Sequence, residues 1–245
     1  MTKILFAISF LFVAASFTKP GGGRDIIEKM YKRYSGKWYK TFSFNQTTER
    51  YRNDSLASTA TWYENIKFPN DFRIDFGNPD SGNAVIYKND SSYLFRHGKR
   101  ANARPDENDL IFLLGGMYFY SYDSALARFT KLGYNLDKFR EDIWKGKPVY
   151  VIGAGKGEDS VNQLWIDKEK LNLVRMIKFH DKEKEEGLFE NHVKLNGGYS
   201  ESLVYFYVND KLIQVEKYHD MKADINIDDS IFDPAKFRKL VPGSY

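Results

Sequence analysis

Hydrophobic and polar residues alternate with a period of two along most of the chain, which predicts β-strands. The clearest example is the segment 72–76, where Phe72, Ile74 and Phe76 share one side and Arg73 and Asp75 share the other. The same pattern predicts further strands at 42–46, 59–64, 84–88, 92–96, 149–152, 163–167, 173–179, 203–208 and 212–218. The sequence Asn-Asp-Lys at 209–211 is typical of a hairpin turn between the last two strands.

Many short strands separated by turn signals indicate an antiparallel sheet rather than alternating strands and helices. A strongly twisted sheet of about ten strands has to curl or split. We therefore predict a mainly β protein with helices (α+β class). Its antiparallel sheet is expected to curl into an incomplete barrel, with helices plugging the open side.

Helical spacing of apolar residues occurs in two places. The segment 25–34 has five, ends before Gly36, and predicts one amphipathic helix. The segment 96–132 begins with a basic, loop-like stretch. It continues with a short helix at 110–114, capped by Asp106 or Asn108, and then a helix capped by Asp123 or Ser124. These two helices are either a stopper for the open side of the sheet or ordinary core helices.

The first 15 residues have the pattern of an export signal. One lysine precedes an unbroken apolar run from 4 to 15, which ends in small residues, so we expect cleavage near Ala15. Residues 16–24 contain three consecutive glycines and are expected to be a flexible spacer, followed by a single domain at 25–245. Because the chain has no cysteine, a lipid anchor on a cysteine and disulfides are both excluded. We expect an exported, periplasmic protein that is not lipid-anchored.

No pattern typical of catalysis is found in the sequence. The four histidines, at 97, 180, 192 and 219, are scattered without metal-ligand spacing, and the segment GAGKG at 153–157 lacks the other residues of a phosphate-binding loop. We therefore expect no metal, no cofactor and no enzymatic activity, and an exposed loop at 182–186. The net charge of +4 is too small to indicate nucleic acid as a partner.

Three stretches resemble the periplasmic carriers of outer-membrane lipoproteins, the LolA-like family. The sequence FSFNQ at 42–46 is similar to the opening strand of that family, and 68–76, with the strands up to 95, is similar to its next strands and prolines. KPVYVI at 147–152, followed by LWID at 164–167, is similar to its late tryptophan–aspartate hairpin, and 225–237 is similar to its closing segment. Together these stretches cover nearly all of the chain that follows the spacer.

The resemblance implies an unclosed barrel around an apolar cavity for acyl chains. Such carriers take lipid-modified proteins from an inner-membrane release complex and pass them to an outer-membrane receptor. That receptor is itself lipid-anchored, so the missing cysteine favours a carrier. The family has an arginine before the first proline of the second stretch, where it latches the lid. In this chain that position is Phe68, next to Lys67, so the resemblance does not predict a lid latch of that kind here.

The chain contains 17 Tyr and 19 Phe, and rigid rings hold a cavity open better than flexible aliphatic side chains. We predict a lipid-binding cavity lined by Phe42, Phe44, Trp62, Phe72, Ile74 and Phe76, under a lid that contains Leu110, Phe112, Leu113 and Phe129. Basic residues that could contact anionic head groups or an acidic receptor surface are Arg96, Lys99, Arg100 and Arg104. We expect a monomer that carries a lipid or a lipid-modified protein. The alternative is a non-catalytic regulatory or scaffold module of the same fold that binds a protein partner.

Overall fold

A computed structural model describes residues 21–181 and 183–237 of the chain. The predicted export signal, 1–15, and most of the predicted spacer lie outside the described residues. Three α-helices are present in the described part: α1 (Gly23–Tyr34), α2 (Asp109–Leu113) and α3 (Tyr122–Lys131). None of the described helices is long and apolar enough to cross a membrane.

The dominant element is one antiparallel sheet, whose strands follow one another in space much as they do in sequence. In chain order they are β1 (Thr41–Arg52), β2 (Ser55–Lys67), β3 (Asp71–Phe76), β4 (Ala84–Lys88), β5 (Ser91–Arg96), β6 (Lys99–Pro105), β7 (Phe139–Trp144), β8 (Lys147–Ile152), β9 (Gln163–Asp167), β10 (Leu173–His180), β11 (Glu183–Glu190), β14 (Leu203–Val208) and β15 (Lys211–Ala223). Their order in the sheet is β6-β5-β4-β3-β2-β1-β15-β14-β11-β10-β9-β8-β7. Strands β12 (Val193–Leu195) and β13 (Gly198–Ser200) form a separate hairpin.

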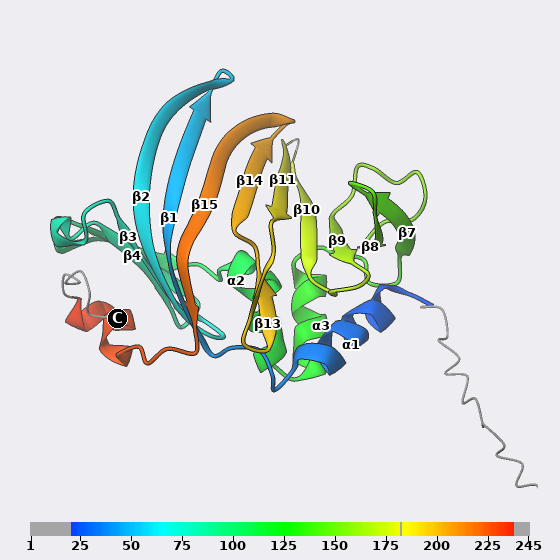
Figure 1. Cartoon of the computed structure of the whole chain (residues 1–245), viewed down its shortest axis with the longest axis horizontal. Coiled ribbons are helices and arrows are strands. Elements are labelled where there is room, and N and C mark those ends of the chain that lie inside the picture. The colour runs from blue at the N-terminus through cyan, green and yellow to red at the C-terminus, as the bar shows by residue number, and fades with distance from the viewer. Residues whose placement is uncertain (1–20, 182, 238–245) are drawn as a thin grey trace, which may run out of the picture.

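The sheet is strongly curved and does not close, because β6 and β7 are its two edges and are not paired with each other (Figure 1). Tight turns with positive φ at Asn53-Asp54, Asn89-Asp90 and Asn209-Asp210 join successive strands. The prediction of a mainly β protein with a curled, open antiparallel sheet is therefore confirmed.

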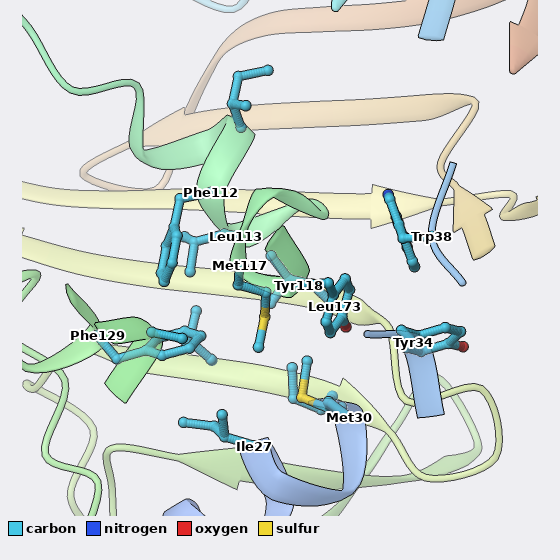
Figure 2. Packing of buried hydrophobic residues seen from close by; sticks show 14 of the residues in the cluster. Ile27, Met30, Tyr34, Trp38, Phe112, Leu113, Met117, Tyr118, Phe129 and Leu173 are labelled. Carbon is cyan, nitrogen blue, oxygen red and sulfur yellow. The ribbon is translucent and has the colours of Figure 1, made fainter. Parts of the chain in front are cut away.

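The helices pack against one face of the sheet and form the main hydrophobic core with it. Figure 2 shows Ile27 and Met30 of α1 beside Met117 and Tyr118, which lie in the 3₁₀ segment Gly116–Phe119. Strand residues such as Leu173 complete this core from the sheet side. The prediction that helices cover the open side of the sheet is confirmed.

The opposite face of the sheet holds a fully buried ion pair on β3. Arg73 donates from Nε and Nη2 to the two carboxylate oxygens of Asp75, at 2.8 Å each, and both side chains have zero exposure. A C-terminal segment that contains the 3₁₀ turns Asp229–Phe232 and Pro234–Lys236 covers the pair. The backbone oxygen of Ile231 accepts a further hydrogen bond from Arg73, at 3.2 Å, and the ring of Phe237 lies 4.8 Å from the guanidinium.

Two loop predictions are wrong, and the strands include one that the sequence does not predict. The basic stretch 96–104 is a β-hairpin, with β6 paired to β5 around a turn at His97-Gly98, and residues 183–186 begin β11. Strand β7 was not expected at all. These strands were missed because their side chains, all exposed on β6 and at least partly exposed at the start of β11 and on β7, show no regular apolar alternation.

The helix boundaries also differ slightly from those predicted. Asn108 caps α2 as expected, since its side-chain oxygen accepts a hydrogen bond from the N–H of Ile111 at 3.0 Å. For α3, neither Asp123 nor Ser124 is the cap; the hydroxyl of Ser121 accepts from the N–H of Ser124, at 3.2 Å. Helix α1 begins at Gly23, two residues early.

Candidate functional site: an apolar cavity with buried carboxyl groups

A cavity of about 210 Å³ lies between the concave face of the sheet and helix α2. Its lining is mostly aromatic and aliphatic and comes from both halves of the sheet, from α2 and from the β12–β13 hairpin. The lining residues are Tyr39, Phe42, Phe44, Trp62, Glu64, Ile66, Phe68, Phe72, Ile74, Tyr87, Asn108, Leu110, Ile111, Leu114, Phe189, Ser200, Glu201, Phe206, Glu216 and Tyr218. A dry cavity of about 150 Å³ already admits a benzene ring, so this one can receive a segment of hydrocarbon.

Five of the six residues predicted for the cavity line it: Phe42, Phe44, Trp62, Phe72 and Ile74. Alternation places them together, because Phe42 and Phe44 on β1 share the concave face with their cross-strand neighbours on β2 and β3. The sixth, Phe76, is outside the lining. Its ring packs edge-on against Trp62, with 5.0 Å between the centroids.

The predicted lid residues divide into two groups. Leu110 lines the cavity, together with Ile111 and Leu114. Phe112, Leu113 and Phe129 are buried but lie in the core between the helices and the sheet (Figure 2). Phe112 and Phe129 meet edge to face with centroids 5.0 Å apart, so they fix α2 against α3 rather than face the cavity.

Phe68 lies where the similar family has its latch arginine, and it lines the cavity. Its ring stacks on Phe119 at 5.5 Å and 3°, which joins the end of β2 to the helical layer through an apolar contact. The neighbouring Lys67 instead forms an ion pair with Asp229 of the C-terminal segment. A hydrogen bond nearby joins the helical layer to the β2–β3 turn: the hydroxyl of Tyr120 donates to Oδ1 of Asn70 at 2.5 Å.

The four predicted basic residues all lie on the β5–β6 hairpin and are exposed. Arg96 and Lys99 face each other across the two strands, and Arg104 forms an ion pair with Asp106 at 3.1 Å. The structure therefore gathers these residues at one edge of the sheet, away from the cavity lining. Charged edge strands also prevent sheets from pairing edge to edge.

Three glutamates in the cavity lining were not predicted: Glu64 on β2, Glu216 on β15, and Glu201 after β13. Each is less than a tenth exposed. Burial, together with the neighbouring carboxyl groups, raises the pKa of Glu64 well above its usual value; burial is the main cause for the other two as well, and it raises the pKa of Glu201 to about 8. One signal in the sequence could have found two of them: Glu64 alternates in phase with Trp62 and Ile66, and Glu216 with Tyr218.

An open groove of about 400 Å³ adjoins the cavity and shares Leu110, Phe206 and Glu216 with it. Its other lining comes mainly from β10, β11, β14 and β15, so the concave face continues beyond α2. In the part of the chain that the structure describes, no three His, Cys, Asp or Glu side chains are placed to hold a metal ion. The geometry is that of a site that encloses an apolar group and leaves one side open.

Comparison with known proteins identifies the fold. No known family model and no curated protein sequence matches the chain. Among solved structures, a DUF1329 family protein from Desulfovibrio piger matches 88% of this chain and 98% of its own, with a TM-score of 0.60 and 13% identity.

Two further solved structures carry family names. A LolA superfamily protein from Nitrosomonas europaea matches with a TM-score of 0.56 and 16% identity, over 86% of this chain and 97% of its own. A putative outer membrane lipoprotein-sorting protein domain from Vibrio parahaemolyticus matches with a TM-score of 0.58 and 13% identity, over 87% and 97%. The chain therefore has the fold of the LolA superfamily.

Proposed function

We propose that this protein is a periplasmic carrier that holds the acyl chains of a lipoprotein, or of a related lipid, in its cavity for transfer to the outer membrane. The observation that carries the proposal is the aromatic cavity between the curved sheet and α2, which continues into an open groove. The likeness in fold to a lipoprotein-sorting domain supports the same function.

The incomplete closure of the site suits a carrier. Burial contributes about 0.8 kcal/mol per methylene, so a fully enclosed chain of about 16 carbons would gain roughly 12 kcal/mol before the costs of binding. Several chains enclosed in this way would reach the practical limit of non-covalent affinity, near 20 kcal/mol, and could not be released. A cavity of about 210 Å³ next to an open groove encloses only part of a chain, which leaves the cargo transferable.

Substitution of Ile74 by Asp tests the cavity directly. Ile74 lines the cavity, so a carboxylate there is expected to weaken binding of an acyl chain at least tenfold, since burial of such a side chain is worth about 1.5–3 kcal/mol. The measurement is displacement of a fluorescent fatty acid, together with mass spectrometry of lipid extracted from protein purified under mild conditions. Ile74→Trp should weaken binding without adding charge, because it fills the cavity.

The matched control is Ile143→Asp, because Ile143 is 63% exposed on the edge strand β7 and should leave lipid binding unchanged. Unaltered lipid content in both Ile74 variants would contradict the carrier function. Capture of a protein partner that persists in these variants and depends on the convex surface would favour the regulatory or scaffold module instead.

We further propose that the β5–β6 hairpin contacts an anionic surface. Exposed basic residues contribute about 1 kcal/mol each near an anionic membrane, so the double variant Lys99→Glu/Arg100→Glu should weaken binding to phosphatidylglycerol vesicles at least tenfold at low salt. Co-sedimentation at low and high salt measures the effect, which salt should suppress. The control is Lys211→Glu/Lys222→Glu, an exposed basic pair on β15. Equal losses in both double variants would show only a general charge effect.

A further inference from the structure

The cavity contains a carboxyl group surrounded by apolar side chains. Glu64 lies between Phe44 and Ile74 on the neighbouring strands, and Trp62 and Ile66 flank it along β2. Glu64 is 5% exposed and lines the cavity. Among the described residues, no side chain or backbone group forms a hydrogen bond or an ion pair with its carboxyl group. Burial of a carboxyl group costs free energy unless the group has a hydrogen-bond or ion-pair partner.

A second acceptor without a partner lies on the same face of β1. Gln46 is 1% exposed, and its amide nitrogen donates to the hydroxyl of Thr48 at 2.8 Å, whereas its amide oxygen has no hydrogen-bond partner in the described structure. Glu216 is different, since Gln214 and Tyr218 donate to its two oxygens at 2.6 and 3.0 Å. Two buried groups in and beside the cavity, the carboxyl group of Glu64 and the amide oxygen of Gln46, therefore have no hydrogen-bond donor from the described protein.

No positive charge balances these groups. The titratable residues in the cavity lining are Glu64, Glu201 and Glu216 with Tyr39, Tyr87 and Tyr218, and no described lining residue is Lys, Arg or His. In the adjoining groove, Lys178 already pairs with Asp109 at 3.0 Å. The chemical complement of this cavity is thus a cationic group rich in N–H donors, attached to an apolar body.

We propose that the ligand of this cavity has a primary ammonium group next to its hydrocarbon tail, and that Glu64 and Glu201 bind this group. The inference rests on the proposed carrier function and specifies the class of ligand for the same site. An ammonium group has three N–H donors. It can therefore form hydrogen bonds with acceptors that lie in different directions. A metal ion, by contrast, would require acceptors that converge on one point. An amino-lipid and an acylated peptide with a free amino terminus share this chemistry.

Protonation gives the proposal a distinctive signature. Because burial raises the pKa of Glu64 well above its usual value and that of Glu201 to about 8, these carboxyl groups hold their protons at neutral pH without a cation nearby. On binding, the ammonium stays protonated, a carboxyl O–H bond breaks, and its proton passes to the buffer. Affinity for an amine should therefore rise as pH rises from 5 to 8, whereas affinity for a neutral ligand should not change.

Three probes with the same tail test this: dodecylamine, dodecanol and dodecanoic acid, each below its solubility limit and below any micelle concentration. Calorimetry in buffers of different ionisation enthalpy is expected to show the amine binding at least tenfold more tightly than the alcohol at pH 8, with release of about one proton. Glu64→Gln keeps the side-chain size and should remove the preference for the amine while leaving dodecanol affinity unchanged. Glu49→Gln, a glutamate paired with Lys217 outside the cavity, is the matched control.

The outcomes separate the two proposals. If amine, alcohol and acid bind equally, or if Glu64→Gln keeps the amine preference, the ammonium site is wrong and the carrier function stands. If none of the three probes binds, the carrier function itself fails. Glu201→Gln offers a second variant if Glu64→Gln does not fold. Phosphatidylethanolamine and an acylated peptide, each compared with its N-acetylated form, then distinguish a lipid from a protein as the source of the ammonium group.

Discussion

Substitution of Asp75 by Ala is expected to lower the free energy of unfolding by about 3–5 kcal/mol, because it leaves the guanidinium of Arg73 buried without its carboxylate. Both side chains have zero exposure, and the two hydrogen bonds between them are 2.8 Å long. Two of the contacts that remain, the Ile231 carbonyl and the Phe237 ring, carry no full negative charge. Urea unfolding measures the loss, provided that the m-value, the slope of the free energy of unfolding against urea concentration, stays unchanged.

Asp71→Ala on the same strand is the matched control. Asp71 pairs with Lys88 at 2.5 Å, but these side chains are 20% and 30% exposed, so the loss should be about 1 kcal/mol or less. Replacing both members of the buried pair, as Arg73→Met with Asp75→Leu, should restore most of the stability, since no uncompensated charge remains. A loss below 1 kcal/mol for Asp75→Ala would show that the pair is not shielded from water as the structure indicates.

The second large loss of stability is expected for Gly115→Ala. Gly115 lies between α2 and the 3₁₀ segment that follows it. Gly115 has a φ of +148°, and a Cβ atom there would lie 2.3 Å from Nε1 of Trp38. The indole cannot move aside, because the rings of Tyr34 and Tyr118 pack on it at 5.1 and 4.9 Å and Gly198 closes its other side. Overpacking and backbone strain each cost about 1–3 kcal/mol, so Gly115→Ala should lower the free energy of unfolding by about 2–6 kcal/mol.

Thermal unfolding of Gly115→Ala and Gly36→Ala separates the two causes. Gly36 has a φ of +72°, but no atom lies within 4 Å of the position that its Cβ would take. Its substitution should therefore cost only the backbone preference, about 1–2 kcal/mol. Similar losses at the two glycines would mean that contact with Trp38 is not what excludes a side chain at Gly115.

The sequence predicted the strands whose apolar and polar side chains alternate and failed where the side chains are largely exposed, as on β6. Phe72, Ile74 and Phe76 alternate because one side of β3 packs on the core, and this alternation was sufficient to place Ile74 on one face with the two phenylalanines. It did not show which face of the sheet is concave, because that depends on the curvature of the whole sheet. On β6 every side chain is exposed, so only backbone pairing with β5 makes this segment a strand. Such pairing leaves no pattern of apolar residues in the sequence.

The cavity was harder to predict than the sheet. Helical periodicity indicates that Phe112 and Leu110 belong to an apolar helix, but it cannot show that one packs on Phe129 and the other lines the cavity. For the carboxyl groups, local sequence gives an incomplete signal. Glu64 and Glu216 lie about 150 residues apart, and only the pairing of β1 with both β2 and β15 brings them to one cavity.

That pairing also determines when the molecule can acquire its cavity during synthesis. Strand β1, near the start of the chain, meets β15, near its end, with Gln46 opposite Tyr218, and this is where the first half of the sheet joins the second. Partners so distant in sequence form late and slowly, because the loop between them has to be ordered first. A nascent chain that lacks β15 would have two separate half-sheets with exposed apolar faces. The cavity therefore forms only after β15 has been synthesised, and a chain truncated before β15 would lose the cavity together with the β1–β15 pairing.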